Sequence, residues 1–289
     1  MIPLSVPAFI LSSPLLAGLI STCIFGRKAA VEGIPGLLFH SVVPVPGREL
    51  SHYPLDRFDA FCRELSDSTY RTICVKDAST GQHPAEGLSG LSPLLLTFDD
   101  GLDSVFHHAL PVLETYGLKA TVFCLGSHFG ELSAWDIFTG NRHLTREQIR
   151  ILVHKGIEIG SHTVTHPCLP YLDMQSIRKE LTESKKTLED ITGYAVTSLA
   201  FPYGAWDKTI WQIALESGYT AATLYRGSPG TIPNLFPVSG VYRFDSPADI
   251  LEKLKNTRLF SSVVARTRMM PHFAKGTPIW RYRKTYSRV

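Results

Sequence analysis

The sequence predicts an α/β fold built on a parallel sheet. Strand-like apolar runs alternate with helix-like amphipathic segments along most of the chain. The 289 residues are enough for one α/β barrel, which uses ~250 residues. Polar residues follow several predicted strands directly. A barrel brings all strand ends to one mouth, whereas an open doubly wound sheet does so only near its switch point.

Each element is expected from the local spacing of apolar residues and from the capping and turn-forming residues at its ends. Apolar residues recur at helical spacing between Leu55 and Leu65, and Thr145 with Gln148 forms a helix-capping pattern. A Gly/Ser/Pro-rich stretch, 78–93, is predicted to be a loop. Expected strands cover residues 34–40, 70–75, 94–98, 120–125, 157–160, 197–201, 219–223 and 237–243. Expected helices cover residues 54–68, 104–116, 145–155, 173–191, 207–217 and 247–256.

The two ends of the chain differ from the middle in charge. Residues 1–30 are apolar, with no charged side chain before Arg27, and are expected to be a membrane anchor or an uncleaved signal, or else an arm packed on the domain. Residues 31–257 form the expected barrel domain. Residues 258–289 hold eight basic and no acidic residues, so of the net charge of +3 the remainder of the chain carries 3 − 8 = −5. Such a basic tail suits an anionic surface, and a solvated, partly disordered chain end is the competing interpretation.

Cysteine usage argues against a disulfide framework or a thiolate metal site. The chain has five cysteines, an odd number, and no Cys-x-x-Cys pair.

Two adjacent acids end the strand expected at 94–98. Asp99 and Asp100 lie within the segment Thr-Phe-Asp-Asp-Gly, at the tip of an apolar run. Two carboxylates at such a place need a group that stabilises their charge, and a metal ion is the obvious candidate. A strand-ending Asp-Gly turn without any metal is the competing interpretation.

Two histidines four residues apart supply the remaining ligands of such a site. His162 and His166 would point the same way on a helical turn, and Pro167 places this turn at the start of a loop. With Asp100 they form an Asp-His-His set, which leaves metal positions open for water and substrate. Asp99 is then available to take a proton from that water.

The three segments Thr-Phe-Asp-Asp-Gly, His-Thr-Val-Thr-His-Pro and Phe-Pro-Tyr-Gly resemble the motifs of the polysaccharide deacetylase family, carbohydrate esterases with a NodB-homology domain. The resemblance covers about residues 34–256. It implies a distorted or incomplete (β/α) barrel of about seven strands, with the active site at the C-terminal strand ends. It also implies hydrolysis of acetyl groups on sugars.

Carried over residue by residue, the resemblance makes Asp100, His162 and His166 the ligands of a divalent metal, with zinc the first choice. Asp99 becomes the general base, and the backbone N–H of Tyr203 helps to hold the oxyanion. A metal that polarises the carbonyl and acidifies water is what hydrolysis of an unreactive acetamide requires.

The general acid and the partner of the base are less directly indicated. Phe39-His40 resembles the early Tyr-His element of a branch with rearranged motif order, so His40 is the expected acid, with His272 as the alternative. Ala200 stands where the family often has an arginine that steadies the base, and Arg243 is the predicted substitute. Trp135 is expected either to stack on a sugar face or to anchor its loop on the domain by hydrophobic packing.

The sequence therefore predicts an enzyme, a metal-dependent deacetylase of an N-acetylated polysaccharide or amino sugar. A related deacylase of a lipid-linked sugar, an acetyl ester or a cyclic imide is the first alternative, and an inactive glycan-binding protein is the second. The expected partners are the glycan and a membrane surface, with no nucleic acid. A membrane or cell-envelope location is favoured over a cytoplasmic one, and the oligomeric state is left open.

Overall fold

The computed structural model describes residues 34–47, 49–81, 91–133, 140–225 and 232–254. The strands are β1 (Gly36–Phe39), β2 (Ser41–Val43), β3 (His52–Pro54), β4 (Tyr70–Ile73), β5 (Ser92–Phe98), β6 (Thr121–Cys124), β7 (Glu158–Ser161), β8 (Ser198–Ala200), β9 (Ala221–Tyr225) and β10 (Leu235–Gly240). The helices are α2 (Leu55–Ser66), α3 (Val75–Thr80), α4 (Leu110–Thr115), α5 (Arg146–His154), α6 (Met174–Thr192), α7 (Lys208–Glu216) and α8 (Pro247–Leu254). A π-helical turn, η1 (Val105–Ala109), leads into α4, and two 3-10 turns are η2 (Leu169–Tyr171) and η3 (Pro202–Gly204).

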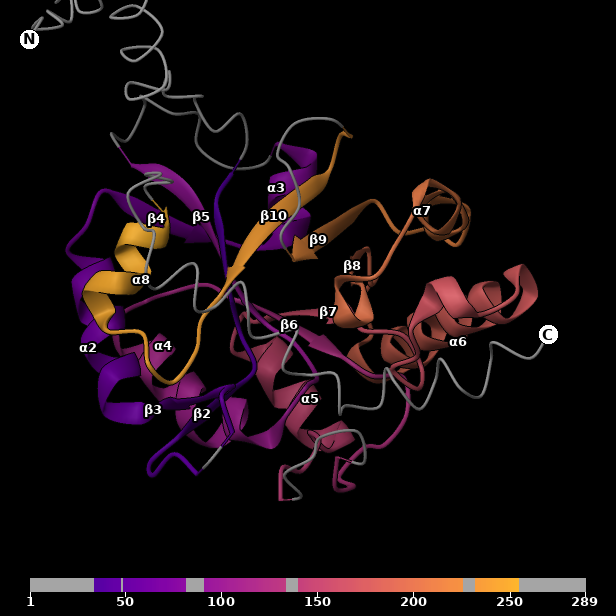
Figure 1. Ribbon diagram of the computed structural model, residues 1–289. Coiled ribbons are helices and arrows are strands. Elements are labelled where there is room, and N and C mark those ends of the chain that lie inside the picture. Colours follow the sequence, from indigo (N-terminus) through magenta and orange to yellow (C-terminus); the bar gives the residue numbers. More distant parts are fainter. Residues whose placement is uncertain (1–33, 48, 82–90, 134–139, 226–231, 255–289) are drawn as a thin grey trace, which may run out of the picture. The chain divides into compact units, whose positions relative to one another are not determined.

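Seven parallel strands close into a barrel (Figure 1). The order β1-β10-β9-β8-β7-β6-β5 is closed by pairing of β5 with β1, where Phe39 lies opposite Phe98. The predicted barrel is confirmed, and its ring is complete. The strand expected at 70–75 exists as β4, which pairs with β5 outside the closed ring.

Side chains alternate between the two faces of the barrel wall. Leu95, Phe123, Ala200, Ala221 and Phe236 come from five different strands and form one cluster inside the ring. The intervening residues face the helices and form the larger core outside the ring. This alternation follows from the two-residue period of a strand and decides which strand-end residues enter the barrel mouth.

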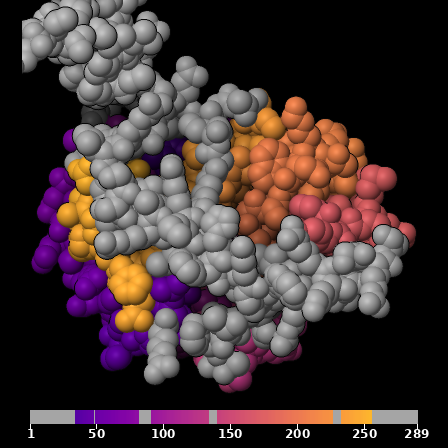
Figure 2. All heavy atoms as spheres, in the orientation of Figure 1, coloured from indigo at the N-terminus to yellow at the C-terminus, as the bar shows by residue number. Residues whose placement is uncertain are grey.

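Helices cover the outer face of the barrel. Neighbouring helices pack as α8 with α2, α2 with α4, α5 with α6, and α6 with α7. Figure 2 shows the yellow residues of α8 against the indigo N-terminal part of the described chain. Helix α5 begins with the predicted capping box, in which Thr145 and Gln148 exchange side-chain and backbone hydrogen bonds.

Two short elements differ from the prediction. Helix α3 begins at the last residue of the strand expected at 70–75 and runs into the stretch expected to be a loop, and Val75 and Ala78 from this helix join the interior cluster. Tertiary contacts hold it, since the backbone N–H of Val75 donates to Thr121 Oγ1 and that of Lys76 to Glu158. These partners begin β6 and β7, so α3 covers the N-terminal end of the barrel. Strands β2 and β3 form a separate two-stranded sheet that local spacing does not reveal.

No helix within the described ranges is long and apolar enough to cross a membrane. The apolar segment 1–30 and the basic tail 258–289 lie outside these ranges, as does the boundary between the tail and the domain. The expected division of the chain therefore stays a prediction.

Candidate active site

The two adjacent acids leave β5 in different directions. Asp99 continues the strand, because its backbone N–H donates to the Phe39 carbonyl at 3.0 Å. Asp100 adopts a left-handed backbone conformation with φ of 67°, and Gly101 follows with φ of 58°. His143 supports this turn by donating from Nδ1 to the Asp100 carbonyl at 2.9 Å. Asp99 therefore lies inside the barrel mouth, while Asp100 turns toward the end of β7.

His162 and His166 reach the site from the loop after β7, not from a helical turn. Thr163 and His166 have positive φ, so the chain winds tightly between the two imidazoles. The carboxylate of Glu180, on α6, holds this loop. It accepts hydrogen bonds from the backbone N–H groups of Val164 and Thr165 at 2.8 and 3.0 Å.

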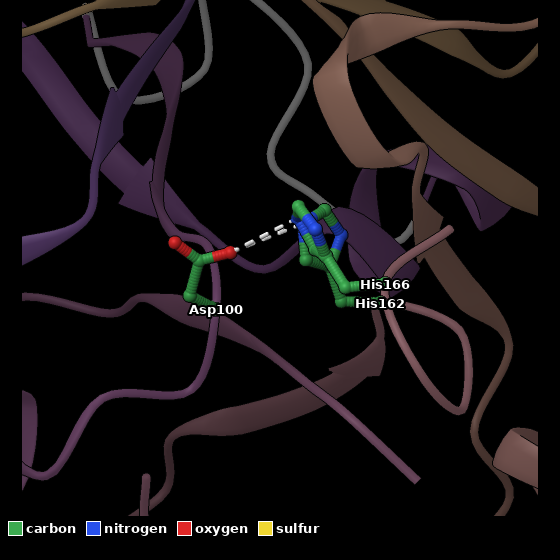
Figure 3. Close-up of side chains that lie close together, drawn as sticks. All are labelled: Asp100, His162 and His166. Atoms are coloured by element: carbon green, nitrogen blue, oxygen red, sulfur yellow. Dashed lines mark ion pairs between the residues drawn. The ribbon is translucent and has the colours of Figure 1, made fainter. Parts of the chain in front are cut away.

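Asp100, His162 and His166 converge as the sequence predicts (Figure 3). Asp100 Oδ1 lies 3.5 Å from His162 Nε2 and 3.3 Å from His166 Nε2. Their potential ligand atoms all lie within 4.8 Å of one another. His162 Nδ1 donates to the Ala200 carbonyl at 2.8 Å, which leaves Nε2 as an acceptor facing Asp100. One carboxylate oxygen and two imidazole nitrogens are a donor set that suits zinc or a related divalent metal.

Electrostatics keep two of the three residues, Asp100 and His166, in a form suited to binding a cation. Burial opposes ionisation of Asp100, but its contacts with His162 and His166 outweigh burial and hold its pKa well below the usual range. Burial lowers the pKa of His166 to about 4, so its imidazole is neutral near pH 7. Burial also acts to lower the pKa of His162, but the charges of Asp99 and Asp100 raise it overall. A bound cation would compete with the proton that His162 binds.

Asp99 and His40 lie side by side at the mouth. Phe39 and Phe98 lie opposite each other in the sheet. His40 directly follows Phe39, and Asp99 directly follows Phe98. Burial raises the pKa of Asp99, while the charges of His162 and His40 oppose the rise. Among the described residues, Asp99 Oδ1 and His40 Nδ1 are buried without a hydrogen-bond partner. Each of these two buried atoms therefore retains an unused hydrogen-bonding position.

The structure does not place Arg243 beside Asp99. Its guanidinium donates to the Gly47 carbonyl and lies over the Phe244 ring, 5.2 Å from the ring centroid. These contacts do not support the prediction that Arg243 replaces the arginine absent at position 200. The loop after β10 turns this side chain toward the β2–β3 connection. His162 and His40 are the groups that favour the ionised form of Asp99.

Tyr203 lies beside the histidines in the turn η3. Its backbone is left-handed, with φ of 60° and ψ of 10°. Its ring meets the His166 ring edge-on, with centroids 4.6 Å apart. This position brings the backbone of Tyr203 to the mouth, as an oxyanion-binding role requires. Trp135 and His272, by contrast, lie outside the described residues.

Two supporting residues were not identified from the sequence. His143 holds the turn at Asp100 from 43 positions further along the chain. Glu180 holds the histidine loop and follows His166 by 14 positions. No motif links residues at such separations. The capping of exposed N–H groups by a helix carboxylate becomes visible only once the helix packs against the loop.

Comparison with known proteins connects the site with its family. Residues 90–222 match the family model described as polysaccharide deacetylase. A Bacillus subtilis protein with the provisional name polysaccharide deacetylase YxkH is 32% identical over 190 residues, or 64% of this chain and 62% of that protein. The peptidoglycan-N-acetylglucosamine deacetylase PgdA of Listeria monocytogenes is 33% identical over 43% of this chain, but over only 24% of its own length. This chain thus spans less than two thirds of these relatives.

Solved structures show the same fold. The deacetylase PplD of Streptococcus pyogenes superposes with a TM-score of 0.66 at 23% identity, covering 76% of this chain and 97% of that one. IcaB of Ammonifex degensii has a TM-score of 0.63 at 23% identity, with 77% and 97% covered. The match over residues 90–222, which also contains the three motifs, shows that this part of the chain is similar to the polysaccharide deacetylase family, and the barrel is the fold of these solved structures.

Proposed function

We propose that this chain is a metal-dependent hydrolase that removes acetyl groups from an N-acetylated polysaccharide or amino sugar. The observation that carries the proposal is the convergence of Asp100, His162 and His166 beside a second, separate carboxylate, Asp99. The names of its relatives support the substrate class, since they include deacetylases of peptidoglycan and of chitooligosaccharides.

The fit of a metal rests on the donor set itself. Asp100, His162 and His166 would hold the ion, and the Ala200 carbonyl keeps His162 in the tautomer that presents Nε2. When bound, a divalent ion polarises a carbonyl and lowers the pKa of water. Asp100 is the ligand that balances the ion's charge, because its carboxyl remains ionised over the whole physiological range.

The remaining residues would handle protons and developing charge. Asp99 accepts a proton from the attacking water, since its buried Oδ1 faces the mouth without a hydrogen-bond partner among the described residues. The backbone N–H of Tyr203 donates to the oxyanion as the carbonyl becomes tetrahedral. His40, adjacent to Asp99 across the β1–β5 pair, donates a proton to the leaving amine nitrogen, so that the sugar departs as a free amine.

Acetate release from a panel of acetylated glycans tests this proposal, using metal-stripped and metal-restored protein. Acetate release is expected to require the metal. Asp99→Asn should retain bound metal and lose acetate release, by a factor of about 10² to 10⁴ if general base catalysis is removed. His162→Ala should lose the metal itself, as measured by elemental analysis of dialysed protein.

Exposed residues provide matched controls. Asp190→Asn on α6 and His154→Ala on α5 make the same chemical changes far from the site, and should alter neither metal content nor rate. Full acetate release by Asp99→Asn would refute the role of base. Glycan binding by the wild-type protein without hydrolysis would favour a binding module, and release from esters or cyclic imides alone would assign the other deacylase activities.

A further inference from the structure

Two tyrosines occupy the part of the barrel mouth that the motifs leave unassigned. On β9, Ala221 belongs to the interior cluster, and Tyr225 follows it by four residues as the last residue of that strand. A separation of four residues keeps Tyr225 on the same, inward face. The same step from Leu95 on β5 leads to Asp99. Tyr225 and the candidate base are therefore corresponding residues at the inner, C-terminal ends of their strands.

Tyr242 reaches the same place from β10. Leu38 pairs with Gly240, and the backbone N–H of Val241 donates to the Leu38 carbonyl at 2.8 Å. Tyr242 follows Gly240 by two residues and His40 follows Leu38 by two, so both residues come just after the C-terminal end of this strand pair. The phenol oxygens of Tyr225 and Tyr242 form a hydrogen bond. The pair consequently covers the mouth on the β9–β10 side, next to the candidate acid.

Two glycines make room for these rings. A Cβ at Gly240 would lie 2.9 Å from Tyr242 Oη and 3.0 Å from Tyr225 Cε2. A Cβ at Gly204, in the turn that carries Tyr203, would lie 3.0 Å from Tyr225 Cβ. All three distances are shorter than most Cβ contacts in proteins. The tyrosine pair therefore extends from the Tyr203 turn to the end of β10, and both rings remain partly exposed.

A buried ion pair holds Tyr242 in position. Asp245 Oδ2 accepts from the backbone N–H of Tyr242 at 2.8 Å and pairs with Lys253 Nζ, whose side chain also donates to the Gly240 carbonyl at 2.8 Å. The side chains of Asp245 and Lys253 are only 1% and 4% exposed. The pair and its hydrogen bonds thus tie the loop that carries Tyr242 to α8 and to the end of β10.

We propose that Tyr225 and Tyr242 form the wall of the site that contacts the sugar ring bearing the acetyl group, and so determine substrate specificity. This inference rests on the proposed deacetylase function. Tyrosine suits the task, because its ring face packs against the apolar C–H face of a pyranose while its hydroxyl hydrogen-bonds to a sugar hydroxyl. Its two side-chain torsions are already restricted here, so little conformational entropy is lost on binding.

The test separates contact with the sugar from a structural role. The double variant Tyr225→Phe/Tyr242→Phe keeps both rings and removes both hydroxyls. Its kcat/KM for an N-acetylglucosamine tetramer, divided by that for a small acetyl ester without a sugar ring, is expected to fall about tenfold, mainly through KM. Tyr194→Phe, an exposed tyrosine before the start of β8, is the control and should leave the ratio unchanged. An unchanged ratio in the double variant would overturn the inference. So would an equal loss on both substrates with a lowered melting temperature.

A binding measurement makes the inference independent of turnover. Calorimetric titration of the same tetramer into Asp99→Asn protein should give a Kd that rises about tenfold when both tyrosines are also changed to phenylalanine. If the wild-type enzyme releases no acetate but this shift in Kd is seen, the proposed function fails and the sugar-contacting role stands. If acetate is released but Kd does not change, the tyrosine pair has no such role. Absence of any binding to Asp99→Asn protein would also reject it.

Discussion

At the scale of single residues, one turn of backbone gives two neighbouring carboxylates different environments. Asp100 meets two imidazoles, and its pKa falls well below the usual range. Asp99 stays in the mouth with its Oδ1 buried, and burial raises its pKa. The left-handed conformation at Asp100 is the cause, because it turns one side chain away from the direction of the strand. His143 and Glu180 support this arrangement from outside the motifs.

We predict that Glu180→Ala weakens metal binding. The carboxylate of Glu180 caps two backbone N–H groups of the loop between His162 and His166. Without it, the two imidazoles lose their fixed spacing, and metal affinity should fall by about 10- to 100-fold. Competition with a chelator of known affinity measures this change. Glu183→Ala, exposed on the same helix, is the control, and equal affinity in the Glu180→Ala and Glu183→Ala variants would contradict the prediction.

At the scale of elements, the local sequence is a good guide to the strands and to the long helices. The spacing of apolar residues correctly predicts helices near α2, α5, α6, α7 and α8 within a few residues. It fails at α3, since six residues cannot form a stable helix without outside contacts. Thr121 and Glu158 supply these contacts from strands that lie more than 40 residues later.

We predict that Gly160→Ala destabilises the barrel. A Cβ at position 160 would lie 2.5 Å from the Phe123 ring, which fills the barrel interior beside β7. Overpacking of this kind costs about 1–3 kcal/mol of the free energy of unfolding, measurable by denaturant titration. Adding Phe123→Leu makes room for the new methyl group. The double variant should therefore lose less unfolding free energy than the sum of the losses in the two single variants. Strictly additive losses would refute the steric explanation.

At the scale of the whole molecule, closure of the barrel buries a carboxylate at its N-terminal end. Glu158 accepts hydrogen bonds from the backbone N–H of Lys76 and from the hydroxyls of Thr121 and Ser198. Burial nevertheless raises the pKa of Glu158 overall. This acid therefore links the closed ring, the helix α3 and the stability of the fold to pH.

We predict that stability falls with rising pH because of Glu158. The native state binds its proton more tightly than the unfolded chain, where the pKa is about 4.3. The stabilising contribution of the protonated form is complete below that value, and is lost as the pH rises through the higher native pKa. The difference in unfolding free energy between wild type and Glu158→Gln, measured from pH 4 to pH 7, should therefore decrease. A difference that is constant or increases with pH would exclude the prediction.

The sequence by itself determined the alternation of strands and helices, the resemblance to polysaccharide deacetylases, and the convergence of Asp100, His162 and His166, because local spacing and short motifs encode these features. Only the tertiary structure decided that seven strands close the ring with β4 outside it, that α3 covers one end, and that Arg243 faces Gly47 instead of Asp99. It also brought Tyr225 and Tyr242 together at the mouth. These features depend on contacts between residues far apart in the chain, and such contacts exist only after the strands have closed around a common core.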